Sequence, residues 1–267
     1  MKLILLGDLH YPTLTDATPE DFQLRRNIYQ RLFEALDAEQ ADACITLGDM
    51  TNSGVPEDLA AIQEFARGMA APLYAVAGNH DTHGCSRAAL FDQLGTAPYY
   101  RVELPQALLL FLDTTLESCV EDWLGVLDTH QYQWLKAQVA QADRPVFIIA
   151  HHPVKETTRR SDERRLQLHA DIWPILSQRA HGVWLNGHNH YHSIVEQQGW
   201  LFVQTGDFPS HMDYRVLELA DNRLTLTTRS LRHLLPPFDP LTPRMQRYTL
   251  YQNLVYDHRE LQAQLDF

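Results

Sequence analysis

Residues 3–10 read Leu-Ile-Leu-Leu-Gly-Asp-Leu-His, a short apolar run that ends in a glycine and two polar side chains. An apolar run of this length, bounded by a turn residue, is typical of a buried β-strand. The same arrangement, in which residues able to bind a metal follow an apolar run, recurs at four further places. These are 44–49 (CITLGD), 73–81 (LYAVAGNHD), 146–152 (VFIIAHH) and 183–190 (VWLNGHNH).

Helical patterns separate these runs, and this alternation predicts an α/β fold. The first helix is expected after Thr18, which can cap it, with Pro19 at its first position and apolar residues 28, 29, 32, 33 and 36 on one face. Further helices are predicted at 59–69, 130–140 and 166–176. Beyond Tyr191 the predicted strands are shorter and more antiparallel. The remaining predicted strands are 108–112, 193–196, 201–204, 215–219 and 224–228.

The pattern of predicted strands and helices ends near residue 234, so the chain of 267 residues divides into residues 1–234 and 235–267. The first part carries all the strand-end motifs and is expected to be the catalytic domain. The second part begins with four prolines between residues 236 and 243, which predict an extended segment, and we expect a helix near the C-terminus. A cap, a packing strap and a homo-oligomer contact are all open roles for this tail.

The composition excludes several classes of protein. A net charge of -12 disfavours binding to a nucleic acid duplex, and the one dense basic cluster is interrupted by Asp162 and Glu163. This cluster (Arg159, Arg160, Arg164 and Arg165) favours a solvated helix face over a phosphate-binding patch, and the five tryptophans, Trp123 among them, are expected to be core or edge residues.

No apolar stretch is long enough for a signal-peptide core or a membrane span, so we expect a cytoplasmic protein without a membrane partner. The three cysteines are too scattered to form a disulfide framework or a zinc site.

The strand ends carry the chemistry. Because the ends of strands in an α/β sheet converge, polar residues that are distant in the sequence can meet in one site there. Each motif alone is weak evidence: those at 8–10 and 48–54 are common turn sequences, while those at 78–81 and 187–190 are rarer. Because all of these motifs occur in one chain, each after a predicted strand, they indicate a functional cluster of side chains that can bind a metal.

The set of motifs resembles that of the calcineurin-like metallophosphoesterase family. The matching blocks are D-x-H at 8–10, G-D-x4-G at 48–54, G-N-H-D at 78–81, H-x-P at 151–153 and G-H-x-H at 187–190. The resemblance implies a four-layer α/β/β/α fold with two mixed β-sheets flanked by helices and metals at the strand ends.

The resemblance also implies two metal ions and their ligands. Asp49 is expected to bridge the ions, with Asp8, His10 and His190 completing the first site and Asn79, His151 and His188 the second. Such a pair neutralises phosphate charge and supplies a hydroxide nucleophile. Imidazole, carboxylate and amide ligands without thiolate suit manganese, iron or zinc.

The remaining histidines receive other roles. Adjacent side chains diverge, so His80 is expected over the substrate as a catalytic acid or anion stabiliser, with Asp81 orienting its ring. His152, His192 and His211 are candidates for substrate contact. His192 shares the face of His188 and His190 if that segment is extended.

Within the family, the D-L-H start and the G-H-N-H end most resemble bacterial cyclic-nucleotide and glycerophosphodiester phosphodiesterases. The expected activity is hydrolysis of a small phosphodiester such as 3',5'-cyclic AMP. A phosphomonoesterase or nucleotidase of the same fold is the main alternative. A non-catalytic scaffold is disfavoured because His80 and every expected ligand are present, and a nuclease is disfavoured by the acidic charge.

Overall fold

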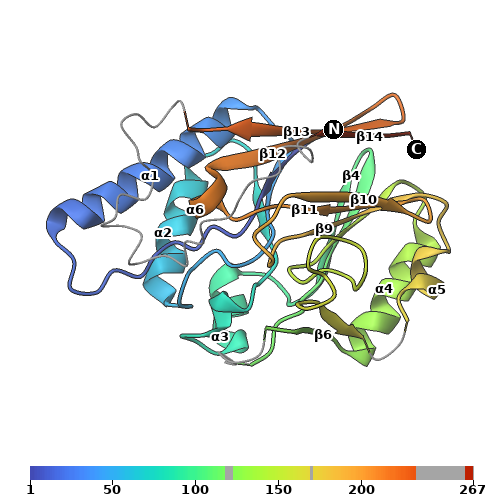
Figure 1. Ribbon diagram of the computed structural model, residues 1–267, viewed down its shortest axis with the longest axis horizontal. Helices are drawn as coiled ribbons and strands as arrows, with labels where there is room; N and C mark the ends of the chain where they lie inside the picture. Colours follow the sequence, from blue (N-terminus) through green and yellow to red (C-terminus); the bar gives the residue numbers. More distant parts are fainter. Residues whose placement is uncertain (118–122, 169–170, 233–261, 267) are drawn as a thin grey trace.

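The computed structural model describes residues 1–117, 123–168, 171–232 and 262–266. Two six-stranded mixed sheets form its centre (Figure 1). The first sheet has the order β14 (Gln262–Asp266), β13 (Arg223–Ser230), β12 (Asp213–Ala220), β1 (Lys2–Leu6), β2 (Ala43–Thr46) and β3 (Leu73–Ala75). The second has the order β10 (Ser193–Gln197), β11 (Trp200–Gln204), β9 (Gly182–Asn186), β7 (Val146–Ile149), β5 (Ala107–Phe111) and β4 (Tyr100–Leu104).

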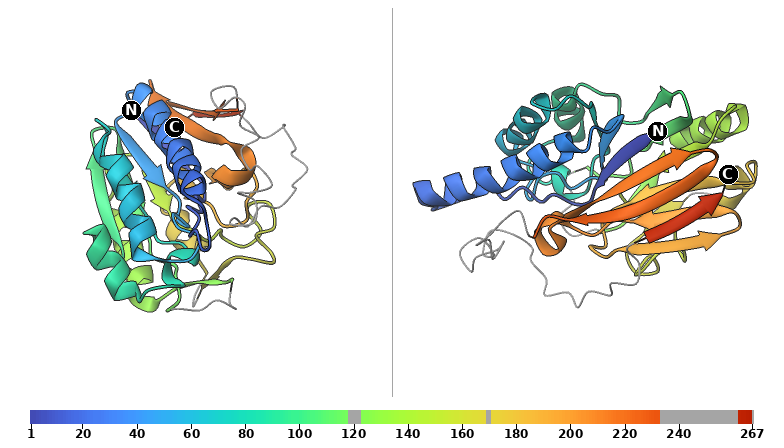
Figure 2. Two further views of the ribbon diagram at one scale, coloured as in Figure 1. Left: turned by 90° about the vertical axis from the view of Figure 1, so that its left-hand side faces the viewer. Right: turned by 90° about the horizontal axis from the view of Figure 1, so that it is seen from above.

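Helices cover the outer face of each sheet, which confirms the expected α/β/β/α layers. On one side lie α1 (Pro19–Ala38) and α2 (Pro56–Arg67), and on the other α4 (Thr129–Gln141) and α5 (Trp173–Leu176) (Figures 1 and 2). The shorter elements are η1 (His80–Thr82), α3 (Arg87–Leu94) and α6 (Phe208–His211), and the short parallel pair β6 (Gly125–Leu127) and β8 (Leu166–Leu168).

Alternation of side chains along β1 explains how the layers pack. Leu3 and Leu5 point into the core between the two sheets, where they join Phe147 and other apolar residues of the second sheet. Ile4 and Leu6 point to the opposite side and pack with the apolar face of α1. The Thr18 capping box begins α1 as predicted, since the Thr18 side chain and the Asp21 side chain bond each other's backbone N–H groups.

Three expectations from the sequence differ from the structure. Residues 166–176 do not form one helix: Leu166–Leu168 pairs as a strand with β6, and α5 is a single turn with Pro174 near its start. The segment that carries the four arginines forms turns rather than a helix. Residues 262–266 form a strand that pairs with β13, and not a helix.

The rest of the tail, 233–261, lies outside the described residues, so the boundary at 234 stays a prediction. In the described part of the chain, no helix combines the length and apolar character that crossing a membrane requires.

The core between the sheets makes a direct prediction about stability. Phe147 is fully buried there, so Phe147→Ala should lower the free energy of unfolding by about 3–5 kcal/mol through lost burial and a residual cavity. The matched control is Phe22→Ala, because Phe22 is 45% exposed. Urea unfolding should show a change of less than about 0.5 kcal/mol for that control. Equal losses in the two variants would contradict the assigned core.

Candidate metal centre

The parallel strands of the two sheets place the motif residues at one edge. The loop after β1 carries Asp8 and His10, the loop after β2 carries Asp49, and the loop after β3 carries residues 79–81. In the second sheet, the loops after β7 and β9 carry residues 151–152 and 188–190. Parallel strands end in the same direction, and the two sheets face each other, so these five loops meet.

Four of the expected ligands form a first buried cluster: Asp8, His10, Asp49 and His190. The His190 Nε2 atom lies 3.2 Å from Asp8 Oδ2 and 3.0 Å from His10 Nε2. Two ring nitrogens at that distance share at most one proton, so at least one lone pair points into the cluster. Such converging lone pairs suit a bound cation.

A second cluster adjoins the first. The His151 Nε2 atom lies 3.1 Å from the Asn79 side-chain oxygen and 3.2 Å from His188 Nδ1. It also lies 3.4 Å from Asp49 Oδ2. The donors here are imidazole nitrogens and oxygen atoms, as in the first cluster, and thiolates are absent from both among the described residues. This chemistry fits manganese, iron or zinc.

Asp49 belongs to both clusters because of how its carboxylate is held. Its Oδ1 accepts a hydrogen bond from the His80 backbone N–H at 2.8 Å, which leaves Oδ2 facing the clusters. Oδ2 lies 3.8 Å from His10 Nε2 on one side and near His151 on the other. A side chain at Gly78 would collide with this carboxylate, so glycine is required at that position. One oxygen atom is thus directed to both clusters.

Asp8 is fixed in a similar way. Both of its carboxylate oxygens accept from the backbone N–H of His188, at 3.1 and 3.0 Å. A side chain at Gly187 would meet the Asp8 carboxylate. The ligand loops of the two sheets are therefore bonded to each other, and the clusters do not rely on a metal to bring the sheets together.

Four of the ligand residues have positive φ angles, which change the direction of their side chains. His10, Asp49, His188 and His190 have φ values of 42°, 47°, 72° and 59°. This left-handed region is costly for side chains other than glycine, and such strain concentrates at functional sites. The segment from His188 to His192 is therefore not extended, and the expectation that His192 shares the face of His188 and His190 was wrong.

The pKa values of the histidines in the two clusters shift in opposite directions. Burial lowers the pKa of His10 and His188 well below the usual value, so both are neutral and offer a lone pair. Burial acts in the same direction on His151, but the charge of Asp49 outweighs it and the pKa rises to about 9. Burial raises the pKa of Asp49, but the charges of His151 and His80 more than reverse this. A positive charge inside the clusters is therefore stabilised by the carboxylates.

His80 lies beside the clusters without joining them. Its Nδ1–H donates to the backbone oxygen of Asn52 at 2.8 Å, because a carbonyl only accepts. The ring packs edge to face with His10, with 4.7 Å between centroids, and the centroid of the Trp123 ring lies 6.3 Å away. Nε2 is the ring nitrogen left for a substrate. Asn52 acts through its backbone, so no side-chain motif could have identified it.

Asp81 does not orient the His80 ring. Its carboxylate accepts from the backbone N–H groups of Met50, Thr51 and Gly78 and from the Thr51 hydroxyl, at 2.9–3.2 Å. Among the contacts of the described residues, none joins this carboxylate to the His80 ring. Asp81 instead fixes the loop of Asp49 to the loop of Asn79. The expected Asp81 to His80 contact was therefore wrong.

The three remaining histidines have distinct places. His152 packs beside His188 with 4.3 Å between ring centroids, and its Nδ1 bonds the Thr114 hydroxyl at 2.8 Å. His192 bonds Asp213 through Nε2 at 3.1 Å and accepts from the Gly206 N–H through Nδ1. His211 donates through Nε2 to the His190 backbone oxygen. His192, His211 and Asp213 thus form a separate cluster that supports the His190 loop rather than joining the two ligand clusters.

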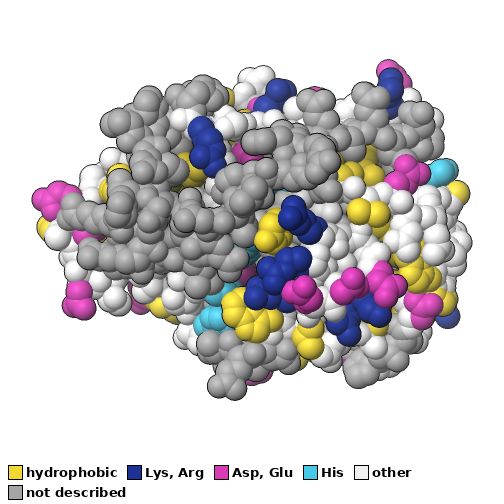
Figure 3. Space-filling view, in the orientation of Figure 1, with side chains coloured by type: hydrophobic (Ala, Val, Ile, Leu, Met, Phe, Trp, Pro, Cys, Tyr) yellow, Lys and Arg dark blue, Asp and Glu magenta, His cyan; other side chains and the backbone are white. Residues whose placement is uncertain are grey.

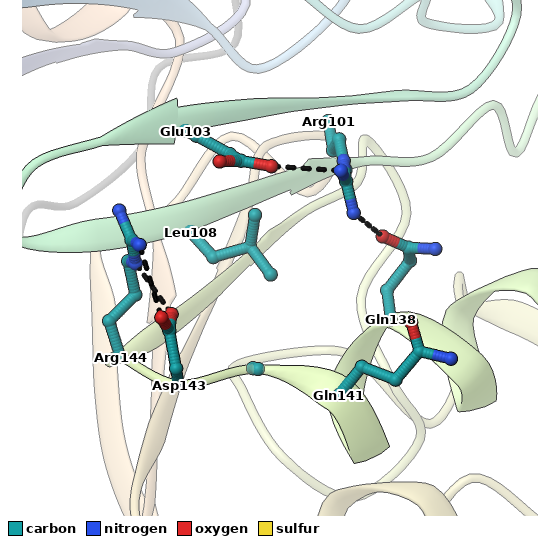
Figure 4. Close-up of a pocket in the computed structure, with 8 residues that line it drawn as sticks. Arg101, Glu103, Leu108, Gln138, Gln141, Asp143 and Arg144 are labelled. Atoms are coloured by element: carbon teal, nitrogen blue, oxygen red, sulfur yellow. Dashed lines mark hydrogen bonds and ion pairs between the residues drawn. The ribbon is translucent and has the colours of Figure 1, made fainter.

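A surface pocket between β4 and the end of α4 lies at the opposite edge of the second sheet, near the start of β5 and β7 (Figure 4). Its charged side chains already bond each other: Arg101 with Glu103 and Gln138, and Arg144 with Asp143. These pairs leave no strong reason to place a charged ligand there.

The Asp81 contacts make a testable prediction. Asp81→Asn replaces an acceptor oxygen by an NH2 group that faces N–H donors, and this should destabilise the fold by about 1–3 kcal/mol. It should also loosen the Asp49 loop and lower the metal content of the purified protein. Asp92→Asn, at an exposed position of α3, is the matched control and should change neither thermal stability nor metal content. A fully stable Asp81→Asn protein with unchanged metal content would contradict the assigned role.

Comparisons with known proteins agree with this geometry. The chain is 32% identical over 122 residues to the glycerophosphodiester phosphodiesterase GpdQ of Enterobacter lignolyticus, a match that covers 43% of each chain. The chain thus matches less than half the length of that relative. It is 24% identical over 225 residues to a probable cyclic nucleotide phosphodiesterase of Psychrobacter arcticus, which covers 74% of this chain and 77% of the relative.

Solved structures show the same fold. A dimetal phosphatase from Danio rerio superposes with a TM-score of 0.71 at 16% identity, over 86% of this chain and 96% of the other. The family model described as calcineurin-like phosphoesterase matches residues 1–192, the stretch that holds every ligand loop. On this match, and with two adjoining ligand clusters at the strand ends, the chain belongs to the calcineurin-like phosphoesterases.

Proposed function

We propose that the protein is a two-metal phosphodiesterase that acts on a small phosphate ester. The observation that carries the proposal is the position of Asp49 Oδ2, which is directed to both ligand clusters while its other oxygen is held by the backbone. A single metal site would need no shared carboxylate. Two ions that share one oxygen ligand are kept close in spite of their repulsion, which is the arrangement used to clamp a phosphoryl group.

Seven side chains would hold the ions. Asp8, His10 and His190 would complete the first site, and Asn79, His151 and His188 the second, with Asp49 in both. Manganese, iron and zinc all suit these ligands. When bound, such a pair neutralises phosphoryl charge and activates water. Backbone N–H groups bind the carboxylates of Asp8 and Asp49, so the protein itself orients these two ligands.

His80 would act on the substrate. Its ring is fixed by the bond from Nδ1–H to the Asn52 oxygen, and Nε2 remains for the phosphate ester. When protonated, Nε2–H can donate to a phosphoryl oxygen or to the leaving alkoxide. The contact with Asn52 preserves this orientation in either protonation state.

The proposed substrate class rests on the similarity of this chain to named phosphodiesterases. Two of the relatives bear names of phosphodiesterases, one for glycerophosphodiesters and one for cyclic nucleotides. We therefore propose a small diester as substrate, with 3',5'-cyclic AMP as the first candidate. Hydrolysis of a monoester by the same centre is the competing activity.

The first prediction for this function is metal-dependent diester cleavage. Protein stripped by a chelator should not hydrolyse bis-p-nitrophenyl phosphate or cyclic AMP, and added Mn²⁺ should restore both reactions. Titration should saturate at two ions per chain, counted by elemental analysis. A preference for p-nitrophenyl phosphate over the diesters would replace the diesterase proposal by a monoesterase. Saturation at one ion would contradict the two-metal centre.

The second prediction separates ligand from catalytic side chain. Asp49→Ala should lose both ions because it removes their common ligand. His80→Ala should keep both ions and lower kcat by about 10²–10³-fold, because it removes a proton donor or charge stabiliser. His130→Ala, at an exposed position of α4, is the control and should leave metal content and kcat unchanged. Full activity of His80→Ala would refute its assigned role.

A further inference from the structure

Two arginines that are bonded to the ligand loops through the backbone lie on aromatic rings. The Arg164 guanidinium lies 4.3 Å from the ring centre of Trp123, and the Arg159 guanidinium lies 4.3 Å from that of Tyr191. Neither forms an ion pair with a carboxylate of the described residues. Their neighbours differ, because Arg160 pairs with Glu163 and Arg165 donates to the Asp162 backbone oxygen. We call Arg159 and Arg164 the arginine rim.

The rim is attached to the metal centre through the backbone. Asn189, which lies between two expected ligands, donates through Nδ2 to the backbone oxygens of Arg159 and Arg164 at 3.3 and 3.2 Å. Gln204 adds a bond to the Arg159 oxygen, and the Arg159 N–H donates to the Ser193 hydroxyl. The turn that carries the rim therefore keeps a fixed position relative to the His188 and His190 loop.

The aromatic residues place the rim on the substrate side. The Trp123 ring lies 6.3 Å from the His80 ring and contacts the Arg164 guanidinium. Its side chain is one of the two large apolar ones that the described structure exposes. In the space-filling view, Lys and Arg side chains gather beside hydrophobic and histidine side chains near the middle of one face (Figure 3). Trp123 is thus an exposed residue beside His80, and of the two expected positions, core or edge, the core is excluded.

Stacking leaves each guanidinium able to bind an anion. An arginine that lies on an aromatic face keeps its N–H donors in the guanidinium plane, and those donors match two oxygens of a phosphate. The ring restricts the side chain, so less entropy is lost on binding. An unpaired cation in an acidic protein, held next to a phosphate-hydrolysing centre, favours a negatively charged ligand.

We propose that Arg159 and Arg164 bind a second phosphate of the substrate, beyond the one that is hydrolysed. The substrate class is then a phosphate ester or anhydride that carries two phosphates, and such a compound replaces 3',5'-cyclic AMP, which has one phosphate, as the first candidate. This inference rests on the proposed phosphodiesterase function and narrows its substrate. Trp123 and Tyr191 act as positioning residues, since they hold the guanidinium groups in place.

The experiment compares AMP and ADP as inhibitors of bis-p-nitrophenyl phosphate hydrolysis, with Mn²⁺ in excess. The two nucleotides differ by one phosphate, so the contribution of adenine contacts is the same in both inhibition constants and cancels in their ratio. ADP should inhibit about tenfold more tightly than AMP. Arg159→Ala and Arg164→Ala should each reduce this preference for ADP several-fold. For Arg164→Lys, the preference for ADP should lie between that of the unsubstituted protein and that of Arg164→Ala. Lysine keeps the positive charge but lacks the planar guanidinium that binds two phosphate oxygens at once.

Arg165→Ala is the matched control, because Arg165 belongs to the same turn and contacts neither aromatic ring among the described residues. It should retain the full preference for ADP. Equal inhibition by AMP and ADP, or an unchanged preference in both rim variants, would overturn the proposal.

Failure of the proposed function is distinguishable from failure of the rim. If the metal-loaded protein hydrolyses no diester, calorimetric titration with AMP and ADP measures the same preference without turnover. A preference for ADP that the rim variants abolish would support the rim even then, and its absence would overturn the rim. Melting curves confirm that each variant is folded.

Discussion

The carboxylate of Asp49 is the constraint on which the site depends. One backbone N–H binds this carboxylate. Burial raises its pKa, but the charges of His151 and His80 outweigh burial and keep the pKa well below the usual range. Removing such a group from water is costly unless every lone pair finds a partner. The backbone bond satisfies Oδ1 and leaves Oδ2 for cations. The left-handed conformation of Asp49 and the absence of a side chain at Gly78 are the local cost of that placement.

The two sheets are organised around this requirement. Apolar residues of β1 and β7 meet in a common core, which fixes the distance between the strand ends. Hydrogen bonds between loops then complete the alignment, as when the His188 N–H binds Asp8 from the other sheet. Asp81 plays the same part within the first sheet by joining the Asp49 and Asn79 loops. The metal centre is therefore preorganised by contacts that involve no metal.

The side chains around the metal centre have different contacts, and we assign them different roles. His80, the proposed catalytic side chain, lies beside Trp123, and Arg164 of the arginine rim lies on the ring of that tryptophan. His192 and His211 bond protein groups and support the His190 loop.

The sequence by itself determined the α/β class, most strand positions and the residues that follow the strand ends, whereas the four-layer arrangement was implied by the family resemblance. It did so because apolar periodicity and strand-end polarity are local features, and because the Thr18 capping box is encoded within four residues. Only the tertiary structure decided what each side chain contacts. The strand at 166–168 exists because β6 pairs with it, Asp81 binds backbone donors of a distant loop, and positive φ angles turn His192 away from His188. Arg164 was indistinguishable from its neighbours in the sequence, and its role depends on Trp123, a residue that only folding brings beside it.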